Sequence, residues 1–197
     1  MTTPAETAAV VARVAAAREA LGPDRDVAVD FHGRFTAASA HRALTGLAEE
    51  GLDLIEVSLS GTDALTVLAR ARELLGPGRP LGAGTVLTAD DARAARRAGA
   101  AFLVTPGLGD AVAAAHDLGL PVLAGVFTPT DVIAARTMGT AALKIFPIAQ
   151  AGGAAYLKVL RGPFPDAAFV PVGGVDEAAA RACLAAGATA VGVGSLL

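Results

Sequence analysis

The sequence is poor in cysteine, in long apolar runs and in runs of basic residues, and each shortage excludes a class of protein. Its single cysteine, Cys183, leaves no partner for an intrachain disulfide and excludes a cysteine-based zinc site. No run of about 18 apolar residues occurs, so no membrane span is expected. The formal net charge of −3 comes without a basic run, which gives no electrostatic footprint for nucleic acid. Residues 1–6 lack the features of a signal peptide, so a cytoplasmic location is expected.

The composition that remains is that of one apolar globular domain. A chain of 197 residues can bury a sizeable core. Hydrophobic residues make up 53% and charged residues 18%, a balance that excludes a disordered chain. No linker or break in composition divides the sequence, so we expect a single domain over residues 1–197.

Short apolar runs alternate with alanine-rich amphipathic stretches along the chain. After a helix expected over residues 4–21, the expected strands are 27–31, 54–59, 81–86, 102–105, 122–125, 142–146, 169–172 and 190–193. Helices are expected to begin near cap-like residues: Thr36, Thr62, Thr88, Gly109, Thr128, Gly152 and Asp176. Alternating βα units predict a parallel sheet, and eight of them predict a compact (β/α)8 TIM barrel. The sequence stops soon after the eighth strand, so no eighth helix is expected.

Lys144 lies in an apolar run, Ala141-Ala142-Leu143-Lys144-Ile145-Phe146-Pro147, and is one of only two lysines among 16 basic residues. Burial of an amine on such a strand would lower its pKa toward neutrality, and a neutral amine attacks carbonyl carbon to form a Schiff base. Alternatively, the side chain ends a strand and extends its amine to water. The other lysine, Lys158, lies in a helical pattern and is expected on the surface.

Glu56 lies on the expected second strand, where the side chains alternate in character. Ile55, Val57 and Leu59 are apolar and should face the helices, so Glu56 and Ser58 should point into the barrel, as Lys144 should from strand six. A carboxylate beside an amine pairs a general base with a nucleophile. The alternative is a buried ion pair with a structural role.

Glycine clusters follow the expected strands seven and eight, where barrels bind phosphate. Gly173-Gly174 and Gly194-Ser195 could bring backbone N–H groups close to an anion, and a helix beginning at Asp176 would add its positive end. Such glycines can also be simple turn formers. Two further turns, after strands three and four, offer hydroxyls that could hold a carboxylate or a water: Gly82-Ala83-Gly84-Thr85 and Thr105-Pro106-Gly107.

From about residue 43 to the end, these motifs together resemble the 2-keto-3-deoxy-6-phosphogluconate and 2-keto-3-deoxy-6-phosphogalactonate aldolases. Six motifs stand in the order of that family: Ile55-Glu56-Val57, Gly82-Ala83-Gly84-Thr85-Val86, Thr105-Pro106-Gly107, Leu143-Lys144-Ile145-Phe146-Pro147, Gly162-Pro163-Phe164-Pro165 and Pro171-Val172-Gly173-Gly174-Val175. The resemblance implies an aldolase of the Entner–Doudoroff pathway or of galactonate degradation. It also implies a phosphorylated keto sugar acid as substrate, no cofactor, no metal and a homotrimer.

The resemblance implies roles for individual residues. Lys144 would form the Schiff base, and Glu56 would shuttle protons. The implied substrate-binding residues are Thr85, Thr105, Pro106, Gly107 and Phe146, with Gly173, Gly174, Gly194 and Ser195 on the phosphate.

Two positions depart from the family pattern. The phosphogluconate type has an arginine near the end of strand two, where this chain has Ser60. The phosphogalactonate type has an arginine at the end of strand one, where this chain has His32 and, two residues later, Arg34. A charge-assisted contact to the substrate carboxylate is worth roughly 1.5–3 kcal/mol, and His32 or Arg34 would have to replace it. The preferred stereochemistry therefore stays open.

Residues 17–34 resemble a segment of galactonate dehydratases of the enolase superfamily, which makes residues 1–42 atypical. The hypothesis is a chimeric or rearranged N-terminus, and the alternative is a convergent strand. In that resemblance Asp30 would bind magnesium and His32 would act as an acid or base. The further acidic ligands are missing from the sequence, so a dehydratase is not expected. Two alternatives to the aldolase stay open: an impaired barrel that only binds a phosphorylated sugar, and a phosphosugar isomerase or epimerase.

Overall fold

The computed structural model describes residues 3–21, 28–31, 43 and 54–192. Residue contacts divide the chain into two compact units. Unit 1 comprises Met1–Val86 and Asp90–Leu103, and unit 2 comprises Leu87–Ala89 and Val104–Leu197. The single domain expected from the sequence stays a prediction.

Unit 1 begins with a helix whose start is encoded locally. The elements in chain order are α1 (Pro4–Leu21), β1 (Ala28–Phe31), β2 (Leu54–Ser58), α3 (Ala64–Leu75), β3 (Leu81–Gly84), α4 (Ala89–Arg97) and β4 (Phe102–Val104). Glu6 accepts hydrogen bonds from the backbone N–H and the hydroxyl of Thr3, and Pro4 occupies the first helical position. The expected bounds of α1 are therefore confirmed.

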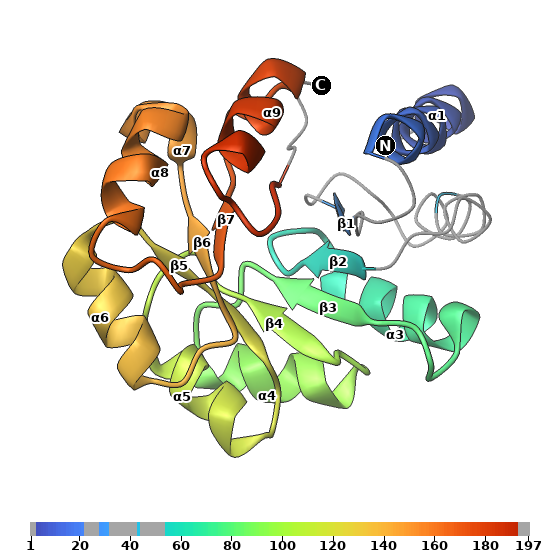
Figure 1. Cartoon of the computed structure of the whole chain (residues 1–197). Coiled ribbons are helices and arrows are strands. Elements are labelled where there is room, and N and C mark those ends of the chain that lie inside the picture. Colours follow the sequence, from blue (N-terminus) through green and yellow to red (C-terminus); the bar gives the residue numbers. More distant parts are fainter. Residues whose placement is uncertain (1–2, 22–27, 32–42, 44–53, 193–197) are drawn as a thin grey trace. The chain divides into compact units, whose positions relative to one another are not determined.

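The strands of unit 1 are parallel and pair in chain order, β1 with β2, β2 with β3 and β3 with β4. Ile55 and Val57 are buried and pair in register with Leu81 and Ala83. Helix α3 packs on β2 and β3 and buries Leu68 completely (Figure 1). The apolar alternation expected for the second strand is thus explained by a helix that covers one face of it.

Unit 2 continues the alternation of strands and helices. Its elements are α5 (Asp110–Asp117), β5 (Val122–Val126), α6 (Pro129–Thr137), β6 (Ala142–Ile145), α7 (Ile148–Ala151), α8 (Gly153–Arg161), β7 (Phe169–Pro171) and α9 (Glu177–Ala185). The strands β5, β6 and β7 pair in parallel. Their core includes Ile145, Leu157 and Phe169, each fully buried. This core fixes β6 between its two neighbours.

The prediction of a closed eight-stranded TIM barrel is wrong. The parallel strands follow the order β1 to β7, and no described residue pairs β7 or a further strand with β1, so the sheet is open. At the eighth expected strand, residues 190–193, the described residues form a single bridge between Gly192 and Val172. Alternation of strands and helices predicts parallel pairing, but closure also requires a matching tilt and stagger of the strands. The predicted α/β class is confirmed, and only the predicted closed barrel is wrong.

Two helix boundaries also differ from expectation. Helix α3 begins after Asp63 rather than Thr62, and Asp63 adopts a left-handed backbone with φ 55°. The unexpected short helix α7 precedes Gly152, whose φ of 110° separates it from α8. Among the helices of the described ranges, none is long and apolar enough to cross a membrane.

Candidate functional site

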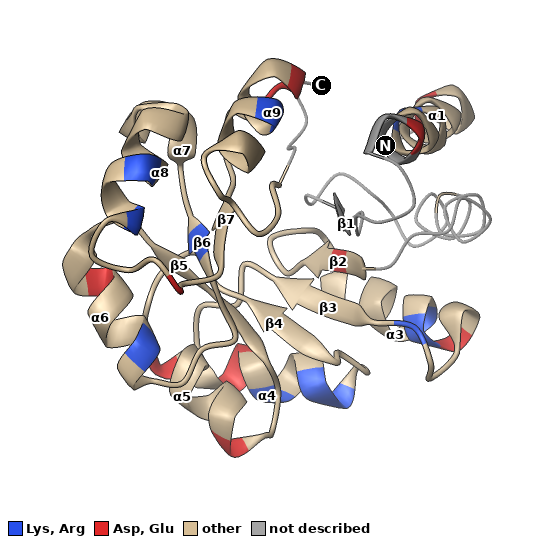
Figure 2. Ribbon diagram, viewed as in Figure 1, with Lys and Arg blue, Asp and Glu red and all other residues tan. Residues whose placement is uncertain are grey.

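Among the described residues, the charged positions lie mostly on helices, whereas β2 and β6 each carry one ionisable residue, Glu56 and Lys144 (Figure 2). Glu56 belongs to unit 1 and Lys144 to unit 2. An ionisable residue on a strand of a parallel sheet costs desolvation energy, which marks both positions as candidates for function.

Lys144 lies on the face of β6 opposite the core. Leu143 and Ile145 are 3% and 0% exposed, whereas Lys144 is half-buried, which confirms the expected alternation along this strand. The Lys144 Nζ lies 5.3 Å from the centre of the Phe146 ring. The aromatic ring therefore lies beside the amine, at a distance that allows a cation–π contact.

The turn of Thr105, Pro106 and Gly107 is held against Gly125, the residue of β5 that pairs with Lys144. Thr105 is 1% exposed, and its Oγ1 accepts a hydrogen bond of 3.4 Å from the Gly125 N–H. A Cβ at Gly125 would lie 2.1 Å from the Pro106 carbonyl carbon. Glycine is thus required at this position of β5 for the turn to come so close to the strand.

The Gly173-Gly174 turn after β7 lies against Phe146. Gly173 has φ 93°, and a Cβ there would lie 2.9 Å from Phe146 Cδ2. Gly174 has φ 71°, and a Cβ there would lie 2.6 Å from Ala149 Cβ. Both positions require glycine, because the backbone is left-handed and an added Cβ would clash, so another residue could not replace either of them without strain.

Helix α9 begins directly after Asp176, as the sequence predicts. Asp176 caps this helix, because its Oδ1 accepts a hydrogen bond of 2.8 Å from the Ala179 N–H. One donor of the first turn is thereby used, and a carboxylate already occupies the end of the dipole. An anion beside this turn would therefore depend on the backbone of Gly173 and Gly174.

In unit 1, the Glu56 carboxyl group lies over the backbone of Gly84. A Cβ added at Gly84 would lie 1.6 Å from Glu56 Oε1. Glu56 itself is half-buried and pairs in register with Gly82 on one side and with Asp30 on the other. The bare backbone of β3 therefore sets where the carboxylate lies.

A chain of three hydroxyl groups follows the ends of β2 and β3, and it was not predicted from the sequence. Ser58 Oγ lies 2.8 Å from Ser60 Oγ and 2.8 Å from Thr85 Oγ1. Thr85 has φ 55°, a left-handed conformation. The available signal was weak: a serine that ends β2, a second serine two residues later in the turn, and a β-branched residue directly after Gly84.

Four expected site residues lie outside the described residues: His32, Arg34, Gly194 and Ser195. Within the described residues, no group of three or more His, Cys, Asp or Glu side chains could hold a metal ion.

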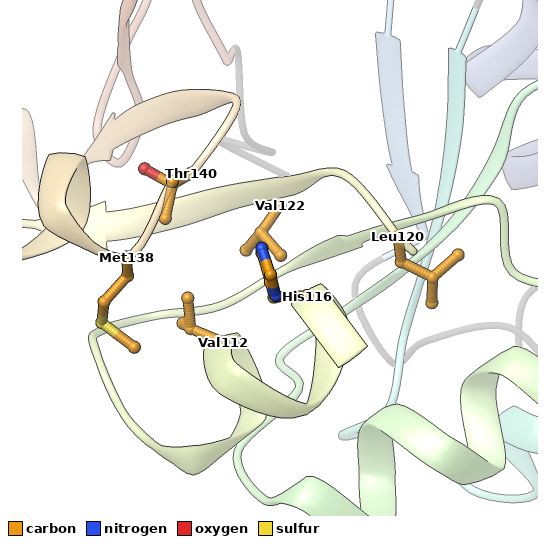
Figure 3. Close-up of a pocket in the computed structure, with 7 residues that line it drawn as sticks. Val112, His116, Leu120, Val122, Met138 and Thr140 are labelled. Carbon is orange, nitrogen blue, oxygen red and sulfur yellow. The ribbon is translucent and has the colours of Figure 1, made fainter. Parts of the chain in front are cut away.

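A small pocket in unit 2 lies at the amino ends of β5 and β6, beside α5 (Figure 3). Its lining includes Val122, the first residue of β5, and Thr140, which precedes β6. His116, which is exposed on α5, also lines it. In parallel α/β sheets the chemistry takes place at the carboxyl ends of the strands, so this pocket is not the candidate site.

Comparison with known proteins identifies relatives along most of the chain. A 2-dehydro-3-deoxy-phosphogluconate aldolase of Pseudomonas aeruginosa is 42% identical over 131 residues, which cover 66% of this chain and 59% of that protein. A probable 2-dehydro-3-deoxy-6-phosphogalactonate aldolase of Rhizobium meliloti is 33% identical over 160 residues, or 80% of this chain and 75% of the relative. The match thus spans about three fifths of the length of the first of these curated relatives.

Solved structures agree with this relationship. The aldolase of Legionella pneumophila, with pyruvate captured as a covalent carbinolamine intermediate, is 26% identical with a TM-score of 0.74. The superposition covers 84% of this chain and 79% of that one. The family model described as KDPG and KHG aldolase matches residues 35–197. The match includes every strand from β2 to β7, and the chain belongs to the KDPG and KHG aldolase family.

Proposed function

We propose that this protein is a class I aldolase that cleaves 2-keto-3-deoxy-6-phosphogluconate or 2-keto-3-deoxy-6-phosphogalactonate to pyruvate and glyceraldehyde 3-phosphate. The observation that carries the proposal is the setting of Lys144 on β6. Its amine lies beside Phe146, and its strand pairs with the residue that supports the Thr105 turn. Membership of the family favours this reaction over isomerisation or mere binding, since neither alternative needs an amine on this strand.

The proposed reaction begins when the Lys144 amine attacks the C2 carbonyl of the keto acid and forms a carbinolamine. Loss of water gives a protonated imine, which accepts the electron pair released when the C3–C4 bond breaks. The C4 hydroxyl loses its proton, and the aldehyde leaves. Protonation of the resulting enamine at C3, followed by addition of water, releases pyruvate and restores the amine. The carbinolamine captured in the Legionella relative is an intermediate of this kind.

Glu56 is the proposed proton carrier, and neutral groups are proposed to bind the substrate. Thr85 and the turn of Thr105, Pro106 and Gly107 would hold the keto acid end, and Phe146 would pack against it. Gly173 and Gly174, together with Gly194 and Ser195, would present backbone N–H groups to the phosphate. A homotrimer in the cytoplasm, without a cofactor, belongs to the same proposal.

Trapping with pyruvate and borohydride tests the proposal directly. Borohydride reduces a pyruvate imine to a stable adduct, and peptide mass mapping locates it. The sequence has only two lysines, so the adduct on a lysine has to be assigned to either Lys144 or Lys158. We expect the adduct on Lys144, its loss in Lys144→Arg and its retention in Lys158→Arg. Lys158 is exposed on α8, which makes it a matched control. An unaltered protein that yields no adduct on Lys144 at any pyruvate concentration would contradict the proposed function.

A further inference from the structure

Two glycines of β3 leave bare backbone beneath side chains of the neighbouring strands. In unit 1, Gly82 pairs in register with Glu56 of β2 on one side and with Phe102 of β4 on the other (Figure 1). Gly84 stands two residues nearer the carboxyl end of β3. Side chains alternate along a strand, so both glycines share the face opposite to that of the fully buried Ala83.

The ring of Phe102 fills the space over Gly82. A Cβ added at Gly82 would lie 2.2 Å from Phe102 Cε2, 2.3 Å from Cζ and 2.6 Å from Cδ2. All three of these atoms belong to the ring, so the aromatic side chain lies across the strand where the glycine makes room. This is the space directly beside Glu56, because Gly82 is its partner in the register.

The Glu56 carboxyl group lies over the next glycine of the same face. Its Oε1 would be 1.6 Å from a Cβ added at Gly84, and Gly84 pairs in register with Ser58, the last residue of β2. A rise of about 3.3 Å per residue puts this place roughly 6.6 Å nearer the carboxyl end than the space over Gly82. In parallel α/β sheets the chemistry takes place at that end.

We propose that Phe102 is a positioning residue for the proton carrier: its ring closes the space over Gly82 and keeps the Glu56 carboxyl group over Gly84. A glutamate side chain has several rotatable bonds, so open space beside it would let the carboxyl group spread over more than one place. The inference rests on the proposed function, in which Glu56 moves protons. Phe102 acts through Glu56 and contacts no reacting atom.

Phe102→Ala tests this role, because it opens the space over Gly82. The carboxyl group can then move by several ångströms, and we expect kcat for pyruvate release to fall about 10- to 100-fold. KM should stay within about threefold, since the change removes no group that binds the substrate. Phe102→Leu keeps apolar bulk at the same position and should lower kcat only about two- to fivefold.

A second change at Gly82 separates positioning from support of the fold. The backbone of Gly82 is not left-handed, and an added Cβ would stand where the ring of Phe102 lies. Gly82→Ala alone forces the ring to move and should lower kcat. Added to Phe102→Ala, the same change refills the space and should raise kcat by at least about fivefold. A residue with a merely structural role would not reverse the effect of its neighbour on kcat.

Leu103→Val is the matched control. Leu103 follows Phe102 on β4, but it is fully buried and pairs in register with Ala83 on the other face. The variant should be less stable in urea, whereas its kcat per folded molecule, with folding followed by circular dichroism, should stay within about twofold.

Undiminished kcat in Phe102→Ala, or a loss that Gly82→Ala does not relieve, would overturn the inference, while the Lys144 adduct of the unaltered protein upholds the proposed function. If Phe102→Ala does not fold, Phe102→Leu in a Glu56→Gln background decides. No further loss of kcat supports the inference, because Glu56 is already disabled, and a loss as large as in the unaltered background overturns it. Absence of the Lys144 adduct would overturn the proposed function and the inference with it.

Discussion

An alanine at Gly84 should disable Glu56 without unfolding the protein. The added Cβ would lie 1.6 Å from Glu56 Oε1, 2.6 Å from Cδ and 2.9 Å from Cγ. Ordinary contact begins at 3.4 Å, so the carboxylate oxygen must move by at least 1.8 Å, the difference between 3.4 and 1.6 Å. The three nearest atoms all belong to one flexible side chain, and Gly84 is not in the left-handed region. The backbone can therefore stay where it is.

The expected magnitudes differ sharply between stability and activity. Because a side chain that can rotate relieves the clash, the free energy of unfolding should change by less than about 1 kcal/mol. A displacement of an acid–base group by more than 1 Å, in contrast, lowers turnover by roughly 10²-fold. Urea denaturation gives the first quantity. Release of pyruvate from the phosphorylated keto sugar acid gives the second.

A double-variant comparison shows whether the loss passes through Glu56. Glu56→Gln should slow turnover by about 10²–10⁴-fold, and adding Gly84→Ala to it should cost little more, because both changes remove the same group. Gly78→Ala is the matched control, with nothing within 4 Å of the added Cβ and no left-handed backbone. Fully multiplicative losses in the double variant, or undiminished turnover in Gly84→Ala, would refute the placement of the carboxylate over this glycine.

Three further changes have distinct expected results. Gly125→Ala brings a Cβ to 2.1 Å from the Pro106 backbone, which cannot rotate away. The free energy of unfolding, measured by denaturation, should therefore fall by about 1–3 kcal/mol, and pyruvate trapping should weaken. A stable variant with normal trapping would contradict the contact. Thr128→Ala removes the capping box of α6 and should cost about 1 kcal/mol of unfolding free energy, whereas a loss near zero would show that the cap is dispensable. Partial burial acts to raise the pKa of Asp131, but hydrogen bonds from the backbone of Thr128 and Phe127 together outweigh it and hold the pKa below its ordinary 3.8. Asp131 therefore stabilises the fold above about pH 3.8 and loses this contribution as the pH falls through its folded pKa, so acid unfolding followed by circular dichroism should be less steep in Asp131→Asn.

Much of the fold could be predicted because its signals are local. Thr3, Pro4 and Glu6 determine where α1 begins. The pattern of apolar residues correctly located seven of the eight expected strands. Closure of the barrel could not be predicted in the same way. It depends on the pairing of residues far apart in the sequence, and the described residues near position 190 supply only the bridge at Gly192.

The candidate site was predictable where a residue conflicts with its surroundings. Lys144 and Glu56 are charged residues in apolar strands, and a single sequence shows that conflict. The hydroxyl chain shows no such conflict, because serines and threonines are ordinary in strands and turns. Its partners, Ser58 and Thr85, lie 27 positions apart, and only the pairing of β2 with β3 brings them within 2.8 Å.

Two classes of glycine among the described residues separate turn formation from function. Gly119 and Gly139 end helices with left-handed backbones and have nothing within 4 Å of an added Cβ, so only conformation requires them. At Gly84, Gly125 and Gly173, an added Cβ would come within 3.0 Å of a proposed site residue. These three glycines stand at or just beyond the carboxyl ends of strands, where the absence of a side chain makes room for another group. Substitution should therefore impair stability alone in the first class, and ligand binding or turnover in the second.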